Sequence, residues 1–308
     1  MHYTGTVYRN PYEPPSPLLE ITQGCSHNRC KFCNMYSDVK FRPTPMEWIE
    51  EDVKEIASMY PEISRLQLLS ADPFVLGFDR LNEICDIIHK YLPNIEIMTM
   101  VARVDNMSDK SVEDLKILKD KGIVEVNIGA ESGDDETLKR VNKGYQGKDI
   151  LEQCEKLDKA GIEYWLTFLN GVGGVELSKQ HALNSSKIFS QANPTVVGTG
   201  GLVLFEGTGL LAQYRRGKFH PLSEKGLMEE LKLFIEHLDF DGRFITHHTI
   251  SMNLNNVDFT QNKEKILQNL QYGIDNLDVD RLTQIRNNKR GLYGYRSNNG
   301  ISKKTCKY

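Results

Sequence analysis

Short apolar runs alternate with longer amphipathic stretches along most of the chain. Runs such as RLQLLS and VEVNIGAE have the length and the content of buried strands. Between them, apolar residues recur every three or four positions, as in DRLNEICDIIHKYL, which is the spacing of one face of a helix. Glycines that follow two of the helical stretches, in KDKGI and DKAGI, are helix stop signals. The pattern therefore predicts strands and helices in alternation.

Six strands and six helices are expected from this pattern. Strands separated by single helices form βαβ units and hence a parallel sheet. The order favours an α/β protein with a partial (β/α)6 TIM-type barrel, extended at both ends. An open doubly wound sheet is the main alternative, although no G-x-G-x-x-G follows the first strand. The expected strands are 16–24, 65–70, 95–103, 124–131, 162–172 and 195–205, and the expected helices are 45–60, 79–92, 111–122, 135–144, 149–161 and 178–192.

The length of the chain suits one barrel with short additions. Its 308 residues exceed a usual single domain, but barrels of about 200 to 400 residues occur as one unit. No low-complexity linker interrupts the pattern. We expect an N-terminal extension in 1–14, the barrel in 15–235, and a C-terminal extension of helix and strand in 236–308 that closes the barrel.

Composition and charge exclude several classes of protein. With 39% hydrophobic and 26% charged residues, the chain resembles a globular protein with a full core. A formal net charge of −4 gives no clear nucleic-acid-binding surface. No apolar run is long enough for a membrane span, and the polar, proline-rich start MHYTGTVYRNPYEPPSP has no signal-peptide character. We therefore expect a cytoplasmic protein, in which thiols stay reduced.

Three of the six cysteines lie within nine positions, in GCSHNRCKFCNMY. Cys25, Cys30 and Cys33 form a C-x4-C-x2-C pattern directly after the first expected strand, where α/β proteins place their chemistry. In a reducing compartment, clustered cysteines indicate a metal site. The other three cysteines are scattered, so a second metal site is not expected. Cys85 and Cys154 fall in helical stretches and are expected to be structural, and Cys306 lies in a polar tail.

The number of thiols favours an iron–sulfur cluster. Three thiolates do not complete a tetrahedral zinc site, and His27, the local candidate for a fourth ligand, would have to fold back sharply between two cysteines. In a [4Fe–4S] cluster, three thiolates bind three irons and leave the fourth iron open to an added ligand. From spacing alone, zinc and a metal-free loop remain alternatives.

These features resemble the radical S-adenosylmethionine (radical SAM) superfamily. The usual motif of that family is C-x3-C-x2-C with an aromatic residue before the last cysteine. This chain has Phe32 at that place and one extra residue between the first two cysteines. The likeness covers roughly residues 15–285, and VEVNIGAESGDDETLKRVNKG is similar to members related to the tRNA-modifying Elongator subunit and oxygen-independent coproporphyrinogen oxidase.

The resemblance implies two cofactors, a [4Fe–4S] cluster and S-adenosylmethionine, with specific residues around them. Phe32 would lie in the cofactor site beside the cysteines. Ser70, Ala71 and Asp72 stand where the family has a Gly-Gly-Glu-like segment that holds the amino group of the cofactor. Glu131 and Ser132, in GAESG, would contact its methionine or ribose.

Further polar residues have two interpretations. Arg103 and Asp105 follow the third strand and either bind a carboxylate of substrate or cofactor or neutralise each other. Lys143 is expected to end a helix, where the helix dipole stabilises a cation. The pair His247–His248 offers one side chain to the barrel mouth as a substrate ligand or proton donor, or it is structural. Arg103 and His248 are the candidates for catalytic residues.

The resemblance further implies an enzyme that cleaves S-adenosylmethionine reductively to a 5′-deoxyadenosyl radical, which abstracts hydrogen from a substrate. A reductant such as flavodoxin or ferredoxin would supply the electron. Because the C-terminal region shows no RNA-binding module or cysteine-rich domain, a small-molecule substrate is favoured. Two other hypotheses stay open: a zinc-stabilised binding protein, and a cluster-containing sensor or electron carrier without radical chemistry.

Overall fold

A sheet of eight strands forms the centre of the protein. The computed structural model describes residues 1–9, 12–247 and 256–285. The strand order is β1-β4-β5-β6-β7-β8-β9-β10, parallel from β1 to β9 with β10 antiparallel at the edge, and β2 and β3 form a separate antiparallel pair. The strands are β1 (Leu18–Glu20), β2 (Thr22–Gln23), β3 (Arg42–Pro43), β4 (Arg65–Leu69), β5 (Ile97–Ala102), β6 (Ile123–Glu131), β7 (Glu163–Asn170), β8 (Val196–Gly201), β9 (Arg243–His247) and β10 (Val257–Asp258).

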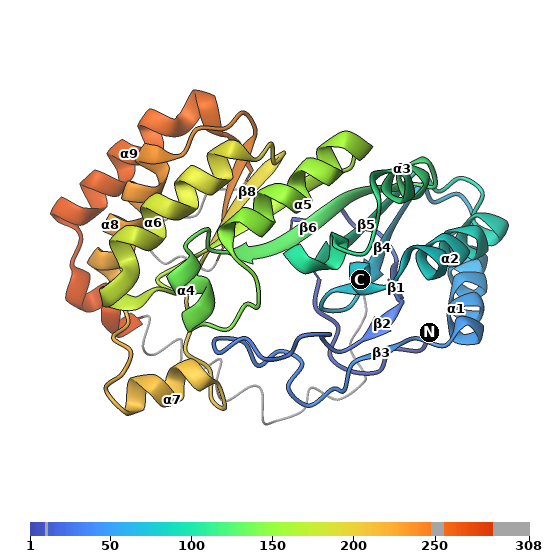
Figure 1. The fold of residues 1–308 in the computed structure, drawn as a ribbon, viewed down its shortest axis with the longest axis horizontal. Helices are drawn as coiled ribbons and strands as arrows, with labels where there is room; N and C mark the ends of the chain where they lie inside the picture. Colours follow the sequence, from blue (N-terminus) through green and yellow to red (C-terminus); the bar gives the residue numbers. More distant parts are fainter. Residues whose placement is uncertain (10–11, 248–255, 286–308) are drawn as a thin grey trace.

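Helices cover one face of this sheet, as Figure 1 shows. Neighbouring helices pack in the row α1-α2-α3-α5-α6-α8-α9. Among the described residues, no helix combines the length and the apolar content that crossing a bilayer requires. The helices are α1 (Met46–Met59), α2 (Phe78–Tyr91), α3 (Val112–Asp120), α4 (Asp135–Arg140), α5 (Gly147–Ala160), α6 (Gly174–Gln191), α7 (Gly209–Arg215), α8 (Glu224–His237) and α9 (Phe259–Asn276), with 3-10 turns η1 (Pro73–Val75) and η2 (Val104–Met107).

The structure confirms the α/β class, the six expected strands and the six expected helices, with corrections of extent. The first expected strand is split into β1 and β2, which belong to different sheets, and the expected helix 135–144 ends at Arg140 in α4. The last expected strand is shorter, because β8 ends at Gly201. The last expected helix is longer, because α6 starts at Gly174 instead of residue 178. The sheet also continues into β9, which pairs in parallel with β8. The division into three regions at residues 14 and 235 stays a prediction.

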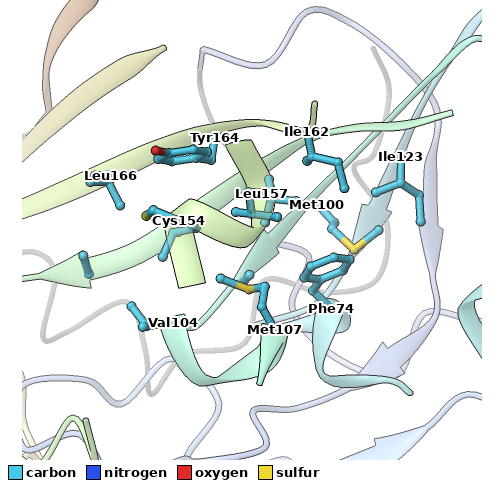
Figure 2. Close-up of a cluster of buried hydrophobic side chains, with 14 of the residues drawn as sticks. Phe74, Met100, Val104, Met107, Ile123, Cys154, Leu157, Ile162, Tyr164 and Leu166 are labelled. Carbon is cyan, nitrogen blue, oxygen red and sulfur yellow. The ribbon is translucent and has the colours of Figure 1, made fainter. Parts of the chain in front are cut away.

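The side chains of each strand alternate between the helices and the inner face of the sheet. Phe168 of β7 stacks on His181 of α6 and Phe234 of α8, so Tyr164 and Leu166 face the helices with it. Figure 2 shows this apolar layer, with Cys154 of α5 close to the strands. The burial of Cys85 and Cys154 in this core confirms that both are structural. The opposite positions of the strands face inward.

The N-terminal segment reaches the inner side of the sheet at two places. The Glu13 carboxylate accepts hydrogen bonds from Arg65 Nε (2.8 Å) and Thr99 Oγ1 (3.0 Å), in β4 and β5. The Tyr12 hydroxyl donates to the carbonyl oxygen of Thr246 in β9 (2.9 Å). Strands β1 and β10, at the two ends of the sheet, do not pair with each other in the described part of the chain. Residues 12 and 13 therefore connect the two halves of an open barrel.

Replacing Gly147 with alanine is expected to destabilise the fold. A Cβ atom there would lie 2.5 Å from the carbonyl oxygen of Gly133, a backbone atom that cannot move aside easily. Overpacking of this kind costs about 1–3 kcal/mol, measurable as a lower free energy of unfolding in urea. Gly5→Ala is the control, because its Cβ would meet Val39 at an ordinary 3.5 Å. Equal stabilities of the two variants would contradict the close contact.

Candidate functional site

The clustered cysteines lie in a loop of residues 24–36, called here the cysteine loop, which follows β2. Gly24 begins the loop with a φ of 69°, and a Cβ there would lie 2.8 Å from the carbonyl oxygen of Val39. Only glycine fits this turn without a backbone shift. The β2–β3 pair then closes the base of the loop.

Two distant segments hold the cysteine loop in place. Lys31 N donates to the carbonyl oxygen of Val141 (2.9 Å), and Asn142 Nδ2 donates to that of Arg29 (2.9 Å). On the other side, Leu210 N at the start of α7 donates to the carbonyl oxygen of Lys31 (2.7 Å). The segment after α4 thus holds the backbone of the cysteine loop on either side of Cys30. The sequence did not reveal this role.

The three cysteines are free thiols with different surroundings. Cys25 and Cys30 are partly buried and Cys33 is exposed. The backbone N–H of Asn28 donates to Cys25 Sγ (3.3 Å), and Arg103 Nη1 donates to Cys30 Sγ (3.9 Å). Such N–H donors stabilise sulfur in its thiolate form.

The Nε2 atom of His27 is already engaged by the protein in this arrangement. Its Nε2 lies 2.6 Å from the carbonyl oxygen of Asn142, so this nitrogen carries the proton and donates. Burial, together with the nearby Arg103, lowers the pKa of His27, which keeps the ring neutral. Within the described residues, no three His, Cys, Asp or Glu side chains are close enough to bind a single metal ion. The donor set suits a cluster with separate iron corners better than one zinc ion.

Unusual backbone conformations gather around the cysteine loop. Non-glycine residues with φ in the left-handed range are Asn28 (42°), Ser70 (130°), Glu131 (66°) and Asn142 (59°), with one more, Asn256, elsewhere in the described chain. Ser70 and Glu131 lie where β4 and β6 end, beside the loop. Strained residues of this kind concentrate at functional sites. The carboxyl ends of the parallel strands and the cysteine loop therefore form the candidate site.

The end of β4 is tied to the cysteine loop. Asp72 Oδ1 accepts a hydrogen bond from Ser26 N (3.0 Å), Ser26 Oγ donates to Asp72 Oδ2, and Ser70 Oγ donates to the carbonyl oxygen of Gly24 (2.9 Å). Burial raises the pKa of Asp72, against the effect of the Ser26 bonds. Ala71 lies between Ser70 and Asp72 in the chain and is partly exposed. Asp72 thus fixes the loop, and contact of these three residues with a cofactor stays a prediction.

Two buried cations lie next to Cys30. Arg103 binds Asp105 (Nη2–Oδ2, 3.1 Å), and it donates as well to the carbonyl oxygen of Lys143 (2.5 Å). Lys143 Nζ donates to the carbonyl oxygen of Gly129 (2.6 Å) and lies 5.9 Å from the ring centre of Phe32. Arg103 therefore pairs with Asp105 and also contacts Cys30 and the backbone of Lys143. Lys143 lies in the same candidate site.

Glu131 and Ser132 point to different parts of the protein. Burial raises the pKa of Glu131, and the opposing charge of Lys143 limits the rise. No ion pair to Glu131 is found within the described residues. The Ser132 hydroxyl lies 2.8 Å from His181 Nδ1 and accepts from Asp134 N (3.0 Å), so it fastens the strand end to α6. His248, the other candidate for a catalytic residue, lies outside the described residues, as does Cys306.

A buried carboxyl near the end of β7 should make stability depend on pH. Burial raises the pKa of Glu230 from 4.5 to about 7, although Asn170 Nδ2 and Gly171 N donate to it. Between these values the folded state holds more protons than the unfolded state, so stability falls as pH rises, by at most about 1.4 kcal/mol per pH unit. Urea unfolding from pH 5 to 8 measures this. Glu230→Gln should flatten the profile, whereas Glu229→Gln, at an exposed site, should not.

Sequence comparison places the chain in a known group. Residues 19–184 match the family model described as the Radical SAM superfamily. The chain is 23% identical over 175 residues to the heme chaperone HemW of Bacillus subtilis, an alignment that covers 56% of this chain and 45% of HemW. It is 22% identical over 234 residues to the uncharacterized protein MJ0486 of Methanocaldococcus jannaschii, covering 71% and 70%. The aligned part of the chain thus spans 45% of the length of HemW and 70% of the length of the archaeal protein.

Solved structures share the fold. Coproporphyrinogen III oxidase (HemN) from Escherichia coli, described as a radical SAM enzyme, aligns with a TM-score of 0.57 and 15% identity, over 74% of this chain and 53% of HemN. The methyltransferase TsrM from Kitasatospora setae, solved with cobalamin and a [4Fe–4S] cluster, aligns with a TM-score of 0.53 and 19% identity, over 65% of this chain and 37% of TsrM. At these identities the likeness concerns the fold.

These findings confirm three expectations: the family resemblance, the partial-barrel class of α/β fold, and, at the level of the family, the two cofactors. The matched region begins in β1 and ends in α6, so it contains the cysteine loop and the ends of β4, β5 and β6. More than half of the chain matches the family model. The protein belongs to the radical SAM superfamily.

Proposed function

We propose that this protein is a radical SAM enzyme in which Cys25, Cys30 and Cys33 bind a [4Fe–4S] cluster. One observation carries the proposal: three free thiols lie in one loop, which is hydrogen-bonded to the end of β4 at Asp72, to the segment after α4 and to the start of α7. A cluster with three thiolates leaves one iron for an exogenous ligand. The cations Arg103 and Lys143 beside Cys30 suit the negative charge of such a cluster.

The charges at the strand ends suit the amino-acid part of S-adenosylmethionine. Its ammonium group would be held by the Glu131 carboxylate, and its carboxylate by Arg103 or Lys143. Ser70 and Ala71 offer backbone carbonyl oxygens at the distorted end of β4, while Asp72 keeps the cysteine loop in position. Phe32 packs with Leu169 and Leu204 on an apolar cluster under the loop, which limits the access of water.

With both cofactors bound, the cluster would supply the electron, and S-adenosylmethionine would supply the radical chemistry that removes a hydrogen atom from the substrate. The chain's own residues orient the reactants and hold the charges. A small-molecule substrate fits an open barrel mouth, and a flavodoxin or ferredoxin would serve as reductant. The cytoplasm provides the reducing conditions that free thiols and a cluster need.

A second candidate function is heme handling without radical chemistry. The similarity to two heme chaperones favours it, at 23% and 26% identity. The two candidates predict different products, because a chaperone does not need to cleave S-adenosylmethionine. A protein that binds heme and cleaves no S-adenosylmethionine would support this second candidate.

Anaerobic reconstitution tests the first candidate. The full chain is loaded with iron and sulfide, reduced with dithionite, and mixed with S-adenosylmethionine. We expect 5′-deoxyadenosine and methionine in equal amounts, detected by chromatography. A cluster that forms without any 5′-deoxyadenosine would overturn the enzymatic proposal, and a colourless protein with one zinc ion would overturn the cluster.

A further inference from the structure

Polar side chains line the inner face of the sheet below the candidate site. Because the apolar positions of β4 to β7 face the helices, the alternate positions face inward. The strand register puts Gln67 opposite Thr99 and Thr99 opposite Glu125. One step nearer the mouth, Asn127 of β6 lies between Val101 and Trp165. We call Gln67, Thr99, Glu125 and Asn127 the inner polar patch.

Asn127 has no hydrogen-bond partner for either side-chain atom within the described structure. Its exposed fraction is only 7%, and the Oε1 atom of Gln67, a residue 2% exposed, lacks a partner as well. A buried polar group without a partner costs about 1–3 kcal/mol. An apolar side chain at residue 127 would avoid this cost, so the amide is kept for a partner that the protein itself does not supply.

Partly exposed inward positions lie beside Asn127 and nearer the mouth of the barrel. Val101 and Thr167, inward positions beside and above it, are partly exposed, whereas the helix-facing residues of the same strands are fully buried. The inward positions Gly129 and Gly198 carry no side chain, and the space beside Gly129 is bordered by the Glu131 carboxylate and the Lys143 ammonium group. Asn127 precedes Glu131 by four residues in β6, but β6 bulges between Ile128 and Glu131, so the two residues pair with Trp165 and Phe168, three positions apart in β7. Three residues correspond to about 10 Å along a strand. A small molecule between the two levels would contact both.

We propose that Asn127 binds a neutral amide-type group of the substrate, a carbonyl next to an N–H, and so sets which molecule is placed under the cofactor. The inference rests on the proposed function and names the substrate class of the same site. An asparagine amide offers two N–H donors and a carbonyl acceptor side by side, which pairs with another amide edge. Gln67 Oε1 adds an acceptor for a further N–H.

The surroundings of Asn127 argue against an anionic group at this position. Glu125 lies on the same face of β6, two residues before Asn127, and Glu13 lies beyond Thr99 with its charge paired to Arg65. A substrate carboxylate would meet these acidic side chains, while the nearby cation Lys143 is bound to the carbonyl oxygen of Gly129 and lies beside Glu131. A neutral amide avoids that repulsion.

Nicotinamide and nicotinate distinguish these groups, because they differ only in amide against carboxylate. Binding of each radiolabelled probe is measured by equilibrium dialysis against the full chain, loaded anaerobically with cluster and S-adenosylmethionine. We expect nicotinamide to bind at least fivefold more tightly than nicotinate. Asn127→Leu, which removes both polar atoms, should weaken nicotinamide binding at least fivefold. The same variant should have an unchanged or higher melting temperature without probe, since it removes an unpartnered polar group.

Gln153→Leu is the matched control, because Gln153 is a buried amide on α5 with an exposed fraction of 5%. It should bind nicotinamide like the wild type. Asn127→Asp keeps the shape of the side chain but loses its N–H donors, so it should also weaken nicotinamide binding. This variant tests the inference if the leucine variant does not fold. Equal binding of both probes, or nicotinamide binding that neither Asn127 variant weakens, would overturn the inference.

The failure of the proposed function would look different. It would appear as a wild-type protein that forms no 5′-deoxyadenosine on reduction, whatever the probes do. A wild type that forms 5′-deoxyadenosine but does not prefer nicotinamide would remove only the amide assignment. The two assays therefore report separately on cofactor cleavage and on the substrate group.

Discussion

Replacing Cys30 with alanine is expected to abolish cluster assembly and, with it, the cleavage of S-adenosylmethionine. Cys30 is the cysteine whose sulfur contacts the buried guanidinium of Arg103, so it lies at the centre of the proposed site. Loss of a direct ligand should exceed the 10- to 100-fold effect that is typical of outer partners of metal ligands, hence about 100-fold or more. Iron and sulfide content after anaerobic reconstitution, and 5′-deoxyadenosine formed per chain, measure the effect.

Cys154→Ala is the control for this experiment. It also removes one thiol, but Cys154 is buried in α5 against the sheet and far in sequence from the cysteine loop. We expect it to keep the full iron content, with a modest loss of stability. A Cys30→Ala protein that still holds the cluster and cleaves S-adenosylmethionine would show that the assignment of ligands is wrong.

Replacing Glu131 with glutamine should weaken binding of S-adenosylmethionine while the cluster stays in place. Glu131 is partly buried at the distorted end of β6, near the opposing charge of Lys143, and has no ion pair within the described residues, so its carboxylate can hold a cationic group of a ligand. A hydrogen bond to a charged group contributes about 1.5–3 kcal/mol, which corresponds to about 10-fold or more in affinity. Equilibrium dialysis with the reconstituted protein gives the dissociation constant.

Glu163→Gln provides the comparison, since Glu163 is exposed at the start of β7, at the opposite end of the strands. Its affinity for S-adenosylmethionine should equal that of the wild type. If Glu131→Gln binds as tightly as this control, Glu131 is structural, and the positive φ of 66° serves the turn after β6.

Most of the sheet could be predicted because its strands are buried on the helix side and bounded by clear helices. The runs RLQLLS and VEVNIGAE became β4 and β6 almost as expected. The start of α6 could not be predicted, because glycines have low helix propensity. Tertiary contacts hold that turn instead: Val175 N donates to the carbonyl oxygen of His220, and Arg140 Nη1 donates to that of Gly173 (2.9 Å).

The cysteines could be recognised from spacing, but their support could not. The sequence favours an ordinary helix end for Lys143, and only the fold brings it to Gly129 and Phe32. The position of Asn127 on the inner face depends likewise on the strand register. A shift of one residue along β6 would turn its side chain toward the helices. Residues far apart in sequence meet here, which no local pattern encodes.

The attachment of the cysteine loop to Val141, Asn142 and Leu210 has a consequence for maturation of the protein. Three peptide segments must be assembled before the three sulfur atoms reach their places, so binding of the proposed cluster would select the native conformer. By mass action, occupancy then protects that conformer against proteolysis. Iron starvation would therefore shorten the lifetime of the polypeptide as well as abolish its activity.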